Sequence, residues 1–262
     1  MELRILGPLV LVHGGRHHAI ASERNRTLLA LLALSDEFPV PAHQLIDGLW
    51  ADRPMQDARN ALQANVARLR KLLESLTGIR GDALVRTVNS GYLLALPKQA
   101  VDAHQFVALA GVGESAVSDR PSEAIEILER ALELWHGPAL FDVCDGLRCG
   151  MEAAHLEERR LSVRQDLITA KLAVGAARGV VSELRALTVE HPERERFSEQ
   201  LMLALYRDGR QTEALDVFHG ARKRLAIELG VEPGHGLRRL YEAILVQDRG
   251  LDVRVPLLPG VA

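Results

Sequence analysis

The sequence predicts a mainly α-helical protein in two parts: a small α+β part formed by residues 1–97 and an all-α part that follows it. In the first part, short β-rich segments near the two ends enclose three helical segments. Beyond Pro97, amphipathic helical segments follow one another and are separated by glycines and prolines. A chain of 262 residues with 47% hydrophobic side chains is large enough for two globular domains.

Positive charge is local rather than spread over the chain. The whole sequence carries a formal net charge of −3, whereas residues 1–97 hold 11 Lys or Arg against 9 Asp or Glu. The remaining residues hold 21 against 26. The overall composition therefore does not indicate nucleic acid as a partner, and a basic surface must belong to a particular element.

The chain opens with strand material. Leu3–Val12 is β-rich and is interrupted at Gly7-Pro8, and His13-Gly14-Gly15 predicts a turn. His17–Ile20 then returns as another short strand. The histidines of this hairpin have no carboxylate beside them, so we interpret them as solvated side chains and predict no metal site.

Two helices are expected next. Thr27–Leu34 is apolar nearly all round and predicts a buried helix. Arg24 and Arg26 stand near its start, where they face phosphate or solvent. Ala42–Trp50 predicts the second helix, and Asp52-Arg53-Pro54 breaks the chain after it.

The third helix is predicted over Ala58–Leu76, with Asp57 as its N-cap and Thr77-Gly78 at its end. At 100° per residue, one side forms a narrow apolar stripe of Leu62, Val66, Leu69 and Leu73. The opposite side carries amides, small residues and cations: Asn60, Gln63, Ala64, Ala67, Arg68 and Lys71. Residues 58–71 include four cations and no acid.

Such a helix suits the major groove of DNA. Arg and Lys bind guanine or phosphates, Asn and Gln pair with adenine, and alanine contacts a thymine methyl group. The alternative interpretation is an ordinary amphipathic helix whose basic face is solvated. The neighbouring elements favour the first interpretation.

A hairpin follows the third helix. Leu84–Val88 and Tyr92–Leu96 are β-rich, and Asn89-Ser90-Gly91 joins them. Strands, three helices and a hairpin in this order predict a winged helix-turn-helix, in which the third helix enters the major groove. The hairpin then reaches the adjacent backbone or minor groove, and we expect Arg86 and Asn89 to lie nearest the DNA.

Residues 98–250 predict an all-α domain, in which antiparallel helix pairs repeat at roughly the tetratricopeptide period. Its histidines have no paired nucleophile or second ligand, so no catalytic, cofactor or metal site is expected. Cys144 and Cys149 have no accompanying Cys or His cluster for zinc. Residues 251–262 read as a loose or docked tail.

The arrangement resembles the Streptomyces antibiotic regulatory protein family of actinobacterial transcription activators over essentially the whole chain. The N-terminal matches are Leu3–Val12, Glu23–Ala30, Leu45–Trp50, Ala58–Leu62, Val66–Lys71 and Gly91-Tyr92-Leu93. The C-terminal matches are Ala204–Gln211 and Glu228–Gly234. The second half resembles the bacterial transcriptional activation domain that accompanies this winged helix.

The resemblance implies an OmpR-type winged helix that binds direct repeats in a promoter as a head-to-tail dimer. The helical domain would support dimerisation and recruit RNA polymerase to a biosynthetic (antibiotic) gene cluster. By position, Arg68 would read a base, with Gln63 and Ala64 beside it. Arg70 and Lys71 would hold phosphates. Trp50 would donate its indole N–H to a further phosphate.

One alternative function is a helical-repeat interaction scaffold without specific DNA binding. A protein-binding helix should place Leu, Met or aromatic residues on its free face, where this sequence has amides and cations. An enzyme is not expected, because the sequence holds no G-x-S-x-G, P-loop or H-E-x-x-H motif. No membrane segment or secretion signal is evident, so a cytoplasmic protein is expected.

Overall fold

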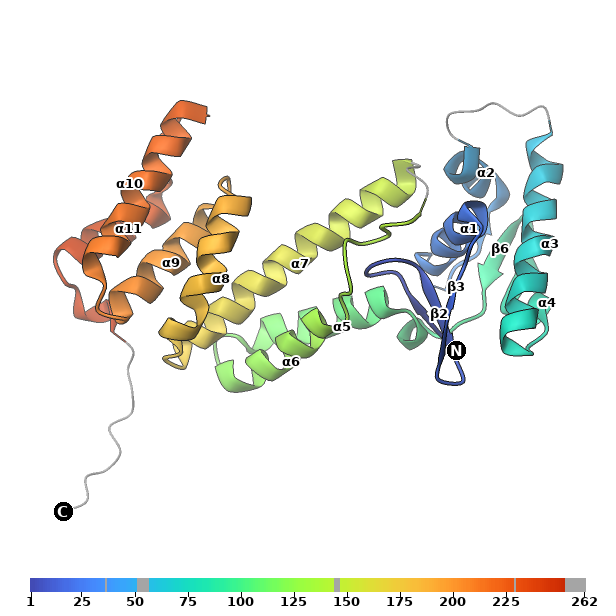
Figure 1. Cartoon of the computed structure of the whole chain (residues 1–262), viewed down its shortest axis with the longest axis horizontal. Helices are drawn as coiled ribbons and strands as arrows, with labels where there is room; N and C mark the ends of the chain where they lie inside the picture. Colours follow the sequence, from blue (N-terminus) through green and yellow to red (C-terminus); the bar gives the residue numbers. More distant parts are fainter. Residues whose placement is uncertain (36, 51–56, 144–146, 229, 253–262) are drawn as a thin grey trace, which may run out of the picture. The chain divides into compact units, whose positions relative to one another are not determined.

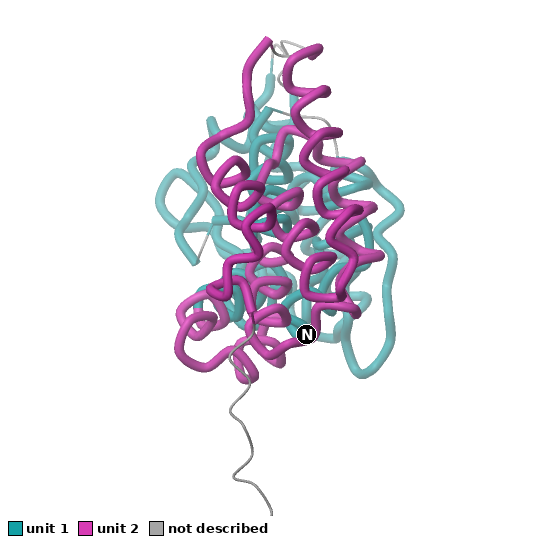
Figure 2. The backbone as a smooth tube through the Cα atoms, turned by 90° about the vertical axis from the view of Figure 1, so that its left-hand side faces the viewer, with its two compact units in different colours: residues 1–111, 129–162 teal, residues 112–128, 163–262 magenta. Residues whose placement is uncertain are grey.

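The computed structural model describes residues 1–35, 37–50, 57–143, 147–228 and 230–252. Helices dominate it, which confirms the predicted mainly α fold with small N-terminal sheets. The chain divides into two compact units (Figure 2). Unit 1 contains residues 1–111 and 129–162, and unit 2 contains residues 112–128 and 163–262. Each unit is described separately below.

Unit 1 begins with an antiparallel sheet of strands β1 (Glu2–Arg4), β2 (Val10–His13) and β3 (Arg16–Ala19), in that order. The turn between β2 and β3 consists of two glycines, both in the left-handed region. Leu3 and Leu11 face each other across the sheet and are fully buried. The predicted N-terminal hairpin is confirmed.

Three helices follow, α1 (Glu23–Ala33), α2 (Ala42–Trp50) and α3 (Ala58–Thr77), and they pack on one another (Figure 1). The hydroxyl of Ser22 caps α1 by accepting from the Asn25 backbone N–H at 3.4 Å. Leucine is the commonest buried residue of the three helices, as the apolar patterns predict. The predicted break at Asp52-Arg53-Pro54 lies outside the described residues.

The hairpin of β5 (Val85–Val88) and β6 (Gly91–Leu94) is present, and we call residues 85–94 the wing. Two further elements were not predicted: strand β4 (Val40–Pro41), which pairs with β6, and the one-turn helix α4 (Gly81–Leu84). The sheet order β4-β6-β5 leaves β5 at the edge. Gly91 is required because a Cβ there would lie 2.3 Å from the Val40 carbonyl oxygen.

Unit 1 continues past Pro97 through a short 3₁₀ turn (Lys98–Ala100) into α5 (Asp102–Ala116). The buried Asp102 carboxylate accepts backbone N–H bonds from Ile5, Leu6 and Ala103 at 2.8–3.1 Å. Burial raises the pKa of Asp102, and these three donors offset part of that effect. Asp102 thus ties the first sheet to residues beyond Pro97, the boundary expected from the sequence.

Arg26 also takes part in this junction, which corrects the expectation that it faces phosphate or solvent. Its Nε donates to the backbone oxygen of Asp142 at 2.7 Å and lies 3.2 Å from the Asp142 carboxylate. Its Nη1 donates to the carbonyls of Ile20 and Ala21. Arg26 is therefore engaged inside unit 1, because its side chain folds back over the start of α1.

Helices α6 (Pro121–Glu133) and α7 (Leu147–Ala173), like α5, contribute residues to both units. Unit 2 continues with α8 (Ala177–Glu190), α9 (Glu195–Arg207), α10 (Gln211–Glu228) and α11 (His235–Leu245). Helix α9 packs against α8, α10 and α11. The first residues of α8 and α10 are 34 residues apart, which matches the tetratricopeptide period.

The end of the described chain is a 3₁₀ turn, Arg249–Leu251. Most of the expected tail, residues 253–262, lies outside the described residues, as does Cys144. Within the described part of the chain, no helix combines the length and the apolar character needed to cross a membrane.

Candidate nucleic-acid interface

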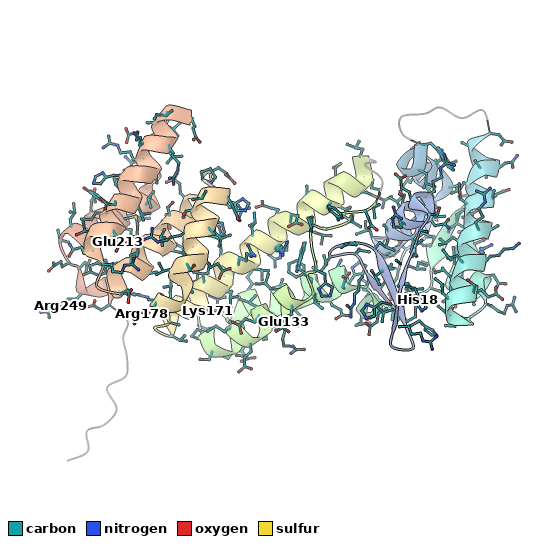
Figure 3. The ribbon with its side chains drawn as sticks, in the orientation of Figure 1. His18, Glu133, Lys171, Arg178, Glu213 and Arg249 are labelled. Atoms are coloured by element: carbon teal, nitrogen blue, oxygen red, sulfur yellow. The ribbon has the colours of Figure 1, made fainter. Side chains whose placement is uncertain are left out.

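Helix α3 lies at one edge of unit 1, and its side chains project outward there (Figure 3). Its leucine and valine stripe is at most 1% exposed and packs against α1 and α2. The polar side predicted from the sequence is exposed: Asn60, Gln63, Ala64, Ala67, Arg68 and Lys71, together with Arg59. The helix thus presents its amides and cations on one free surface, which we call the basic face.

The N-terminal end of this face is held by its cap. The Asp57 carboxylate accepts from the backbone N–H of Asn60 at 3.4 Å and from the side-chain amide of Asn60 at 2.5 Å. The Asn60 side chain therefore keeps its carbonyl oxygen as an acceptor for a ligand, while its Nδ2 is engaged.

Arg68 is oriented by a residue that sequence reasoning missed. Asn65 is only 3% exposed, and its Oδ1 accepts from Arg68 Nη1 at 3.3 Å. Its Nδ2 donates to the Ala61 carbonyl at 3.0 Å, one turn earlier. The signal was an asparagine beside the apolar stripe, three positions before an arginine, where side chains on a helix meet.

Two cations of the basic face are free. Within the described residues, neither the Arg59 guanidinium nor the Lys71 ammonium has a hydrogen-bond or ion-pair partner. Arg59 was not predicted as a site residue. It lines, with Gln63 and Asn89, a cavity of about 110 Å³ between α3 and the wing. Arg59 therefore extends the basic face toward the hairpin.

Arg70 is placed differently from its neighbours. Its Nε donates to the Val85 carbonyl at 2.8 Å and its Nη2 donates to Thr87 Oγ1 at 2.9 Å. The resemblance implied that Arg70 holds a phosphate, but the structure directs its guanidinium to strand β5. The difference arises because Arg70 lies at the margin of the buried side of α3, where its long side chain reaches the wing.

The wing residues are at the surface. Arg86 is exposed and makes a long hydrogen bond, 3.3 Å from Nε to the Ala83 carbonyl. Asn89 is exposed at the tip with φ 51°, a conformation that asparagine tolerates well. Ser90 anchors the turn, since its carbonyl accepts from the Ala42 backbone N–H at 3.0 Å.

Trp50 is 9% exposed, and its Nε1 is buried with no hydrogen-bond partner among the described residues. Donation of this N–H to a phosphate is therefore not available in this conformation, because the nitrogen is buried.

Among the described residues, His, Cys, Asp and Glu side chains do not gather in threes that could hold a metal ion. Among the hairpin histidines, His17 is exposed, whereas His13 and His18 are partly buried. Figure 3 labels His18, which lies on β3.

Two family models match the chain in series. Residues 17–94 match the model described as "Transcriptional regulatory protein, C terminal", and residues 101–245 match the model described as "Bacterial transcriptional activator domain". The first match contains α3 and the wing, and the second contains the helical repeats.

Curated relatives match nearly the whole chain. The transcriptional regulator RedD of Streptomyces coelicolor is 42% identical over 97% of this chain and 73% of its own length. The regulatory protein DnrI of Streptomyces peucetius is 38% identical over 100% of this chain and 98% of its own length.

A solved structure, Mycobacterium tuberculosis EmbR in complex with a low affinity phosphopeptide, is similar with a TM-score of 0.88 and 35% identity. The match covers 94% of this chain and 65% of the EmbR chain. The chain therefore belongs to the Streptomyces antibiotic regulatory protein family of DNA-binding transcription activators.

Proposed function

We propose that this protein binds promoter DNA through the basic face of α3 and the wing, and activates transcription by recruiting RNA polymerase. The observation that carries the proposal is the charge of that face. Arg59 and Lys71 have no internal partner among the described residues, and Arg68 is held by a neutral amide. Cations left without a carboxylate are free to bind phosphates and base edges.

The residues divide by role. Arg68, oriented by Asn65, reads a base in the major groove, with Gln63, Ala64 and Asn60 beside it. Arg59 and Lys71 bind phosphates on either side. Arg86 and Asn89 bring the wing to the adjacent backbone or minor groove.

For the assembly and the target, the proposal is supported by membership of the family. Two copies bind direct repeats head to tail, and the promoter belongs to a secondary-metabolite, antibiotic gene cluster. Residues 1–97 bind the DNA, whereas residues 98–250 support dimerisation and contact the polymerase. The match of residues 101–245 to a bacterial transcriptional activator domain supports this division. The protein would then act in the cytoplasm, at the nucleoid.

Footprinting of the full chain on candidate promoters, combined with transcription in vitro, tests the proposal. We expect two protected half-sites in direct orientation and more transcript when the protein is added. Arg68→Ala should weaken both effects. Arg238→Ala, which removes an exposed arginine of α11 outside the basic face, should leave binding of one copy to a single half-site unchanged. Protein that protects no promoter and stimulates no polymerase would contradict the proposal and favour the interaction scaffold.

A further inference from the structure

The contacts of Arg70 carry an inference that rests on the proposed function and adds a positioning residue to it. We infer that Arg70 is a latch that fixes the wing to the recognition helix, so that α3 and the wing meet DNA as one body. In this role Arg70 acts on DNA through strand β5 and does not itself bind a phosphate.

The pairing of the wing explains why β5 needs such a contact. Ala95 N–H donates to the Leu84 carbonyl at 2.7 Å, so residues 84 and 95 form a hydrogen-bonded pair. Because such pairs alternate along an antiparallel ladder, the backbone groups of Val85 and Thr87 point away from β6. Strand β5 is the edge of the sheet, so these groups require partners from elsewhere.

Arg70 supplies one of those partners from α3 and adds a contact with the side chain of Thr87. Its Nε–H satisfies the carbonyl of Val85, a residue that is fully buried, while Nη2 reaches the Thr87 hydroxyl two residues further along the same strand. The spacing suits the planar fork of a guanidinium, which offers donors in fixed directions. A lysine ammonium keeps the charge but has no such geometry.

Two further contacts join the same stretch of α3 to the base of the wing. The Glu74 carboxylate accepts from the Gly81 backbone N–H at 3.2 Å. Gly81 lies so close to α3 that a Cβ there would be 2.3 Å from the Arg70 carbonyl oxygen. The turns of α3 that expose Arg68 and Lys71 are therefore the turns that hold the wing on their other side.

Both acceptors of Arg70 are neutral, so its charge is not cancelled by these contacts. The two possible roles of Arg70, phosphate contact and latch, therefore predict different DNA binding for the conservative variant Arg70→Lys. A phosphate accepts a lysine almost as well as an arginine, whereas the latch requires the fork.

The first experiment measures amide hydrogen exchange in the full chain without DNA. Arg70→Lys and Arg70→Met should both increase exchange of the β5–β6 ladder about five- to tenfold, because one or two hydrogen bonds that hold the strand are lost. Exchange in α1 should not change. Lys71→Met, on the same helix but without a partner among the described residues, is the matched control and should leave the wing as it is.

The second experiment measures DNA affinity against salt concentration and the footprint of the same variants. The latch predicts that Arg70→Lys and Arg70→Met weaken protection on the wing side and shift the salt slope to the same extent, although only Arg70→Met removes a charge. Lys71→Met should lower the slope by about one unit and leave protection on the wing side unchanged. The inference is overturned by the following result: Arg70→Lys has the DNA affinity and salt slope of the wild type, and Arg70→Met has those of Lys71→Met. In that case amide exchange in the wing would also be normal in both Arg70 variants.

If the Arg70 variants do not fold, Thr87→Val tests the same contact from the other side. This isosteric change removes only the Thr87 hydroxyl and should increase wing exchange about two- to threefold. Unchanged exchange in Thr87→Val would contradict a latch that uses this contact. If the wild type fails to bind promoter DNA, the proposed function fails, while the exchange data still decide whether Arg70 holds the wing.

Discussion

The arginines of unit 2 and those on the basic face of α3 have different kinds of partner. In unit 2, arginines lie beside carboxylates, as in Arg178–Asp208, Arg185–Glu213 and Arg222–Glu232, with nitrogen–oxygen distances of 2.6–3.4 Å. Arg178 and Glu213 are labelled in Figure 3. On the basic face of α3, the cations have either no partner in the described structure or a neutral one.

The difference shows why total charge is a poor guide to function here. A net charge of −3 conceals a face whose positive charge is not neutralised internally. In each of these three ion pairs the arginine is exposed, so the pair contributes little to stability and leaves little net charge for a ligand. None of the three cations Arg59, Arg68 and Lys71 has a carboxylate partner among the described residues, whereas several arginines of unit 2 do.

The largest expected effect is at Arg68. Arg68→Ala should cost ~1–3 kcal/mol of binding free energy on the cognate site and relax specificity at one base position. Competition binding with a set of single-base variants of the site measures both quantities. An unchanged base preference would show that Arg68 does not read the sequence.

Asn65→Ala should have the next largest effect, a loss of about three- to tenfold in affinity for the cognate site, because the Arg68 guanidinium loses its orienting acceptor. A double-mutant cycle with Arg68→Ala measures the coupling. If Asn65→Ala weakens binding equally in the Arg68→Ala background, the two residues act independently and the assigned role is wrong.

Lys71→Ala should weaken binding to all sequences alike and lower the slope of log K against log salt by about one unit. Fluorescence anisotropy over a range of salt concentrations measures the slope. Lys223→Ala, an exposed lysine of unit 2, is the control for loss of one positive charge. Equal salt slopes for Lys71→Ala and Lys223→Ala would show that the basic face contributes no more to DNA binding than unit 2 does.

The smallest effect is expected from Glu213→Gln. Hydrogen bonding by Arg210 lowers the pKa of the Glu213 carboxyl below its ordinary 4.5. The stabilisation is therefore present above about pH 4.5 in the wild type and is lost as the pH falls through the lower, folded value. The difference in thermal unfolding temperature between the two proteins should be small at pH 7 and should shrink as the pH falls below about 4.5. A change in DNA affinity would contradict the division of roles.

The sequence predicted those features of the fold that follow from the periodicity of apolar residues. The 3.6-residue repeat of leucines in α3 defined both its buried stripe and its exposed face, and the caps at Asp57 and Gly78 defined its ends. The hairpin was recognisable from its β-rich segments and its turn. The order of strands, three helices and hairpin predicted the winged arrangement.

What the sequence could not predict depends on distant partners. Arg70 lies 15 residues from Val85, and Arg26 lies 116 residues from Asp142, so neither contact has a local signal. Strand β4 has only two residues and exists through its pairing with β6. The burial of the Trp50 indole likewise results from packing that no local pattern encodes.

Photo-crosslinking measures whether the basic face of α3 or the ion-paired helices of unit 2 lie against the DNA. The photoreactive side chain is placed at Ala64 on α3 or at Thr212 on α10, both exposed. We expect crosslinks from position 64 to the bases of each half-site and none from position 212. Crosslinks from position 212 alone would show that the basic face of α3 is not the DNA-binding surface.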